Sequence, residues 1–202
     1  MKIIELVLDE DNLEENNGIT AISIVQSGAI EEDFIALKNQ EFKFAEQDKE
    51  KRILMGAALV PNKPIYRKSG EEEYYIFFSK DTVRKASELF FIKGNQSEST
   101  LEHESALKGL TVVESWIVEG EQDKSRHYGL NAPIGTWMVS MKVNNDDVWN
   151  NYVSTGKVKG FSIEAYFSSK LEQRPKDKTL KEEAAAQEFI NTISKILKES
   201  NE

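Results

Sequence analysis

The sequence has no cysteine and only two histidines, His103 and His127. Without cysteine the chain cannot form disulfides, thiolate zinc sites or a cysteine nucleophile, so any covalent catalysis must use another residue type. Two histidines are too few for a multi-histidine metal site, and the carboxylates are scattered without a recognisable metal-ligand spacing. We therefore expect no metal or other cofactor, which disfavours a metal hydrolase.

Long apolar runs and excess positive charge are also missing. No stretch approaches the roughly 20 apolar residues that span a bilayer, and the first residues lack the apolar run and cleavage site of a secretory signal. Acidic residues outnumber basic ones by 35 to 26, giving a formal net charge of −9. Proteins that bind a phosphate backbone instead gather Lys and Arg on one surface. We expect a cytoplasmic protein that binds neither membrane nor nucleic acid.

The length of 202 residues, with 39% hydrophobic and 30% charged residues, is typical of one globular domain with a real core. After Phe167 the composition becomes polar, and a pattern of helical spacing follows. The apolar positions of that pattern are Ala186, Ile190, Ile193 and Leu197. We predict a folded domain over residues 1–168, then a polar linker and a C-terminal amphipathic helix over 169–202. The helix either packs on its own domain or binds a partner.

Runs of β-branched or alternating apolar residues indicate strands through the first three-quarters of the chain. They are Ile3–Leu8, Ile19–Val25, Glu41–Ala45, Arg52–Val60, Tyr74–Ser79, Thr111–Val118 and Thr136–Val143. The first two are separated by an acidic, Asn-rich turn, which predicts that they pair. Two helices interrupt the strands, one running from a Ser79 cap to Gly94 and one from an Asn145 cap to Gly156. The fold class is therefore α+β with sheet dominant.

A histidine and a serine far apart in the sequence could form a catalytic pair. A serine hydroxyl needs a base to take its proton, and that base is most often an imidazole. His103 lies in LEHES and Ser162 in GFSIEAYF, whose alternation predicts a strand with Ser162 and Glu164 on one face. Glu164 stands where a G-x-S-x-G nucleophile elbow needs glycine, which disfavours an α/β-hydrolase. From these residues alone, a surface histidine and a solvent-facing serine remain the alternative.

The order of the segments around this pair resembles a known family. LEHE, TVVESWIV, GLNAPIGTWMVSMKV, VWNNY and GKVKGFSIEAYF follow one another as in the phage prohead (capsid maturation) serine proteases, in particular their XkdF-like branch. The early run ITAISIVQSGAIEEDFI also resembles the start of that branch, so the similarity covers roughly Ile19 to Phe167. It implies a fold related to the herpesvirus assemblins, a mainly antiparallel β-barrel or sheet wrapped by a few helices.

The resemblance also implies an activity and partners. Ser162 becomes the nucleophile and His103 the general base of a serine endopeptidase. Such a protease is enclosed in the immature phage capsid within the host bacterial cytoplasm, cleaves scaffold and major capsid proteins, and then commonly degrades itself. The portal protein and a second copy of the chain are further possible partners.

The third catalytic residue is left open by the sequence. The family places an acidic residue on a late strand after the serine. This chain has no such strand, and Ala21 occupies the corresponding position in the look-alike segment AISIV. We predict Glu114, in VVESWIV, because a neighbouring strand can return its carboxylate to the imidazole, where it would fix the tautomer. Glu164 is the alternative, and the donors of the oxyanion hole are not identified.

Other features have simpler interpretations. His127 lies in a polar turn and is expected at the surface, although a second histidine orients the first in assemblins. The tryptophans, Trp116, Trp137 and Trp149, are expected in the core rather than in a stacking platform. Two functions without catalysis also stay open: an inactive phage structural or scaffold-associated protein with the protease fold, and an unrelated binding module.

Overall fold

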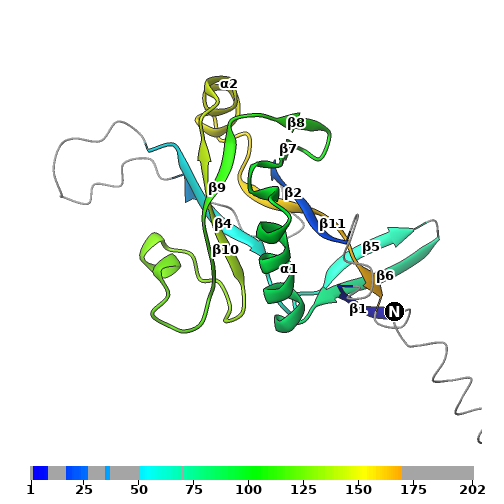
Figure 1. Cartoon of the computed structure of the whole chain (residues 1–202). Coiled ribbons are helices and arrows are strands. Elements are labelled where there is room, and N and C mark those ends of the chain that lie inside the picture. Colours follow the sequence, from blue (N-terminus) through cyan, green and yellow to red (C-terminus); the bar gives the residue numbers. More distant parts are fainter. Residues whose placement is uncertain (1, 9–16, 27–34, 37–50, 70, 170–202) are drawn as a thin grey trace, which may run out of the picture. The chain divides into compact units, whose positions relative to one another are not determined.

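The computed structural model describes residues 2–8, 17–26, 35–36, 51–69 and 71–169 (Figure 1). The chain divides into two compact units, Met1–Ser168 and Ser169–Glu202. The predicted strand Glu41–Ala45 and the predicted C-terminal helix lie outside the described residues. In the described part of the chain, no helix combines the length and the apolar character that crossing a membrane requires.

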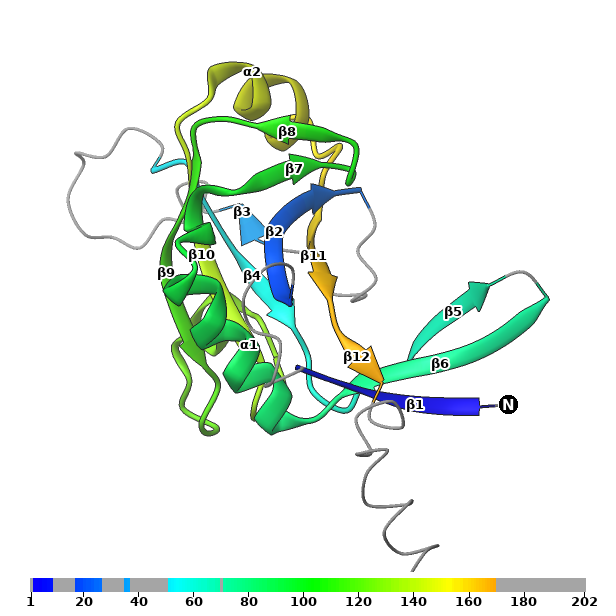
Figure 2. The same ribbon diagram turned by 45° about the vertical axis from the view of Figure 1, so that its right-hand side comes forward.

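The described strands form three four-stranded sheets (Figures 1 and 2). The first has the order β12 (Ser168–Ser169), β1 (Lys2–Val7), β6 (Glu72–Phe78) and β5 (Ile65–Ser69). The second has the order β3 (Ile35–Ala36), β4 (Ile53–Leu59), β10 (Trp137–Val143) and β9 (Leu110–Ile117). The third has the order β11 (Gly160–Tyr166), β2 (Gly18–Val25), β7 (Ser99–Leu101) and β8 (Ser105–Leu107).

This architecture confirms a mainly β protein with few helices, but the described strands do not close into one barrel. The pairs β1–β6 and β2–β7 run parallel, so the first and third sheets are mixed, whereas the described strands of the second sheet pair antiparallel. The predicted pairing of the first two strands is wrong, because β1 and β2 belong to different sheets. The segment between them is longer than the roughly two to five residues of a hairpin loop. It therefore does not hold β2 beside β1, and β2 can pair with other strands.

The short strands β5, β7 and β8 were not predicted from the sequence. Each has five residues or fewer, and their side chains are largely polar or exposed. A strand without a buried apolar face shows no hydrophobic alternation, so only its pairing with a neighbour defines it.

The helices begin where their caps predict. The Ser79 hydroxyl accepts a hydrogen bond from the N–H of Thr82 at the start of α1 (Lys80–Ile92). The Asn145 side chain does the same for the N–H of Val148, at the start of α2 (Asp146–Val148) and the π-helical turn η3 (Trp149–Val153) that continues it. These side-chain oxygens satisfy amide groups that a helix cannot pair internally.

The core of the first unit is built from buried side chains on all three sheets, on α1 and on the turn η3. Trp137 and Trp149 are fully buried, as predicted, and Phe90 of α1 contacts Trp137 edge-on with 5.4 Å between ring centroids. Trp116 is partly buried, and its indole N–H donates to Asp123. The tryptophans therefore serve packing.

Replacing Phe90 with alanine should lower the free energy of unfolding by about 3–5 kcal/mol, because the change leaves a cavity against Trp137. The adjacent Phe91 is 38% exposed and provides the matched control, since Phe91→Ala removes a ring of the same size from the surface. Chemical denaturation of both variants measures the difference. Equal losses would show that α1 does not use Phe90 to pack on the sheet.

Candidate active site

Three hydroxyl side chains lie in a row across the third sheet. Ser162 of β11 is the register partner of Ser23 in β2, and Ser23 is the register partner of Thr100 in β7. Residues directly opposite one another on paired strands point to the same face of a sheet. The chain therefore brings position 162 and the segment around position 100 together through β2.

His103 lies in the tight turn that joins β7 and β8. Glu102 and His103 both have positive φ, 52° and 62°, and the Glu104 N–H donates to the Leu101 carbonyl over 3.0 Å. Two consecutive residues with positive φ are the signature of a type I′ hairpin turn, which Asn-Gly or Asp-Gly usually occupies. Glu and His adopt this conformation at an energetic cost, so other contacts must hold the turn.

Those contacts come from β2 and the residue after it. The Glu102 N–H donates to the Ile24 carbonyl over 3.1 Å, and the Glu102 carboxylate accepts from the Gln26 N–H over 2.7 Å. The His103 N–H donates to the Ser23 hydroxyl over 3.0 Å, and this hydroxyl donates in turn to the Thr100 carbonyl over 3.3 Å. Because Ser23 is fully buried, its hydroxyl fixes the backbone of His103 from inside the sheet.

The imidazole of His103 contacts the carboxylate of Glu164. The Nδ1 atom lies 3.4 Å from Oε1 of Glu164, and the same oxygen accepts a hydrogen bond from the Thr100 hydroxyl. A carboxylate beside Nδ1 favours the tautomer in which Nδ1 carries the proton and Nε2 can accept one. The structure therefore joins His103 to the alternative acidic candidate on the strand that also carries Ser162.

Ser162 lies two residues before Glu164, about 7 Å along the strand. It is 8% exposed, and within the described residues its hydroxyl has no hydrogen-bond partner, His103 included. The β-bulge in this strand pair comes only after Glu164, so the alternation of side chains from Ser162 to Glu164 is regular. The two side chains therefore lie on the same face, as the sequence pattern predicted. Ser162, Glu164 and His103 thus share one face of the third sheet.

Glu114, the preferred third residue from the sequence, lies on β9 in the second sheet and is not brought to His103. Its carboxylate accepts from the Ser140 hydroxyl over 2.6 Å and lies 3.1 Å from Nζ of Lys124. The hydrogen bond from Ser140 and the Lys124 ammonium lower the pKa of Glu114, against the opposing effect of partial burial. Gly109, at φ 82°, separates β8 from β9 and lets the chain turn into the other sheet.

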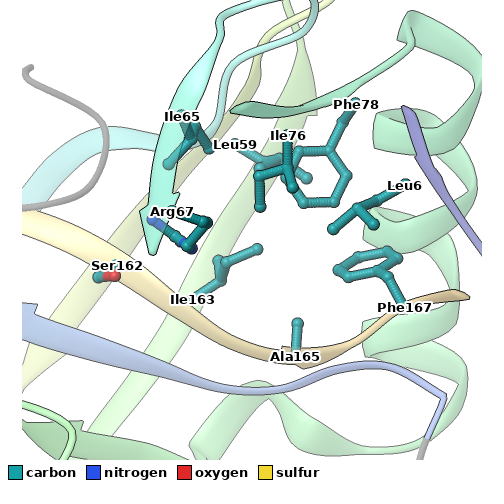
Figure 3. A pocket seen from close by; sticks show the side chains of 10 residues that line it. All are labelled: Leu6, Leu59, Ile65, Arg67, Ile76, Phe78, Ser162, Ile163, Ala165 and Phe167. Atoms are coloured by element: carbon teal, nitrogen blue, oxygen red, sulfur yellow. The ribbon is translucent and has the colours of Figure 1, made fainter. Parts of the chain in front are cut away.

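A pocket of about 250 Å³, lined mainly by residues of apolar type, lies beside Ser162 (Figure 3). The first sheet, the end of β4 and the strand β11 supply its lining: Leu6, Leu59, Ile65, Arg67, Ile76, Phe78, Ser162, Ile163, Ala165 and Phe167. This pocket was not predicted from the sequence, because its residues come from five separate segments. Arg67 lies on β5, a strand that was also not predicted.

His127 is exposed in the 3₁₀ turn η2 (Lys124–Tyr128), which agrees with the surface position expected for it. Among the described residues, no group of three or more His, Asp or Glu side chains is arranged to hold a metal ion.

Comparison with known proteins identifies a family. The family model described as "Putative phage serine protease XkdF" matches residues 41–171, a span that contains His103, Ser162 and both candidate glutamates. No curated protein matches the chain, and no solved structure does. The fold relation to the herpesvirus assemblins therefore stays a prediction.

Replacing Ser23 with alanine should lower the free energy of unfolding by about 1–3 kcal/mol, because the His103 N–H and the Thr100 carbonyl both lose the buried hydroxyl that they bond. Ser99 is a matched control: it is equally buried on the same sheet, but its hydroxyl has no partner within the described residues. Ser99→Ala should be neutral or stabilising. Denaturation curves measure the free energy of unfolding of both variants. Equal losses in the two would contradict the role of the Ser23 hydroxyl.

Proposed function

Since the chain belongs to the family of the putative phage serine protease XkdF, we propose that it is a prohead serine endopeptidase. In this proposal Ser162 is the nucleophile, His103 the general base and Glu164 the third member of the triad. The observation that carries the assignment is the contact between the His103 imidazole and a carboxylate on the strand of Ser162. Glu164 takes the role because Glu114 is engaged by Ser140 and Lys124.

Each residue has a defined part in the reaction. Nε2 of His103 takes the proton of the Ser162 hydroxyl as the oxygen attacks the scissile carbonyl, and then gives it to the leaving amine. Glu164 keeps the Nδ1 proton in place and stabilises the imidazolium, while the Thr100 hydroxyl orients the carboxylate. Water then hydrolyses the acyl-enzyme, with His103 again acting as the base.

The proposal requires His103 to reach Ser162 when substrate binds. Its side chain is 42% exposed at a hairpin turn, so the ring has room to rotate over the sheet face. The Ser162 hydroxyl has no competing acceptor within the described residues. Catalytic hydrogen bonds often tighten only in the substrate complex.

The family supports a phage context for the substrates. We infer that the protease acts inside the immature capsid in the host cytoplasm, and that it cleaves scaffold protein, major capsid protein and its own chain. The portal protein is a further candidate substrate. We propose these substrates from the resemblance to the family, and no contact in the structure bears on them.

A second candidate is an inactive phage structural protein that retains the fold. The observation in its favour is that the described residues show no hydrogen bond between Ser162 and His103. Under this alternative the row of hydroxyls would only stabilise the third sheet.

Co-expression with the major capsid and scaffold proteins of the same phage should yield new termini by intact mass, and Ser162→Ala should abolish them. His103→Asn should do the same while keeping the turn, because Asn tolerates positive φ. Absence of cleavage by the wild type, or cleavage that persists in Ser162→Ala, would favour the inactive structural protein.

The two glutamates form a matched pair for the third role. Glu164→Gln should slow cleavage by a factor of about 10² to 10⁴, because an amide beside Nδ1 favours the wrong tautomer. Glu114→Gln should leave the rate close to that of the wild type, since Glu114 contacts residues outside the site. Time courses of capsid-protein processing measure both rates, and a slower Glu114 variant with an unaffected Glu164 variant would reverse the assignment.

A further inference from the structure

The pocket beside Ser162 has the size and chemistry of a subsite for a peptide side chain. Ile163, Ala165 and Phe167 point into it from β11 and the residue that follows (Figure 3). Its volume of about 250 Å³ lies below the roughly 300–1,000 Å³ of sites for drug-sized ligands. An aliphatic side chain therefore suits the pocket better than a cofactor.

The strand β11 is also able to hold an extended peptide. Among the described strands it pairs only with β2, so it is the edge strand of the third sheet. The pocket lies on the side of β11 away from β2 (Figure 3). Exposed strand edges bind extended peptides by adding a strand, with side-chain pockets providing the specificity.

Arg67 gives the pocket a positive charge. Its only hydrogen bond within the described residues goes from Nη1 to the Tyr66 carbonyl over 2.9 Å, and no described carboxylate pairs with it. The next residue, Lys68, is instead paired with Glu73 at 3.7 Å. A guanidinium has five N–H donors in a fork that matches a carboxylate. Arg67 is thus suited to a carboxylate from outside the described chain.

We propose that this pocket recognises an extended peptide in which a large aliphatic residue lies within about two positions of an acidic residue. The aliphatic side chain enters the pocket, the acidic side chain pairs with Arg67, and the peptide backbone runs along β11 past Ser162. The role of this peptide as a substrate depends on the proposed protease function. The binding of the peptide to the pocket does not depend on that function.

The test uses the full chain with Ser162→Ala and a synthetic random library of peptides of roughly eight residues, the length of a β-strand. Peptides retained by the protein are sequenced by mass spectrometry. Retained peptides should be enriched in an aliphatic residue close to Asp or Glu.

Two further substitutions separate the contributions. Ala165→Phe fills the pocket and should remove the aliphatic preference. Arg67→Gln, at an exposed position, should remove the acidic preference and keep the aliphatic one. Lys68→Gln is the matched control and should change neither. A library without enrichment, or enrichment that survives both pocket variants, overturns the proposal.

Cleavage distinguishes this failure from failure of the protease function. Enriched peptides that bind through Ala165 and Arg67 but are not cut by the wild type leave the subsite standing and contradict the protease. Cleavage of capsid protein at sites without the aliphatic and acidic pair leaves the protease standing and overturns the subsite.

Discussion

The candidate site depends on the buried hydroxyl of Ser23. This group accepts the His103 N–H and donates to the Thr100 carbonyl, so it fixes both the turn and the strand that precedes it. On its other side, β2 pairs with β11 and thereby places Ser162. One central strand thus assembles His103 and Ser162, which lie far apart in the sequence. Because the strand is almost wholly buried, a shift in its register would disrupt the packing on both of its faces, and the same packing therefore fixes the geometry of the site.

The turn that carries His103 combines strain with exposure. Two non-glycine residues hold positive φ there, and hydrogen bonds from both the backbone and the Glu102 side chain compensate. The result is an imidazole whose backbone is fixed while its ring stays 42% exposed. A general base requires this combination, since it must reach a proton on the substrate side and keep its own tautomer. In the proposed triad the carboxylate of Glu164, which contacts Nδ1, has the task of holding the tautomer.

The strand that carries Ser162 also links two sheets. Residues 160–166 pair with β2 in the third sheet, and the chain then continues into β12 of the first sheet. Phe167 lies at this crossing and contacts Phe78 edge-on, with 4.8 Å between ring centroids. The pocket lies at this crossing. The same segment therefore supplies both the proposed nucleophile and the proposed subsite, which ties the chemistry to the recognition of substrate.

Local patterns in the sequence determined the helix caps at Ser79 and Asn145, the longer strands, the shared face of Ser162 and Glu164, and the family. Caps and alternation depend on neighbours within a few residues, so they can be read without a fold. Which of Glu114 and Glu164 lies beside His103 could not be read in this way. It depended on which sheet β9 joined after Gly109 and on which strands flanked β2. Only the tertiary structure decided these points, because strand pairing is set by burial and packing between distant segments, which no local pattern encodes.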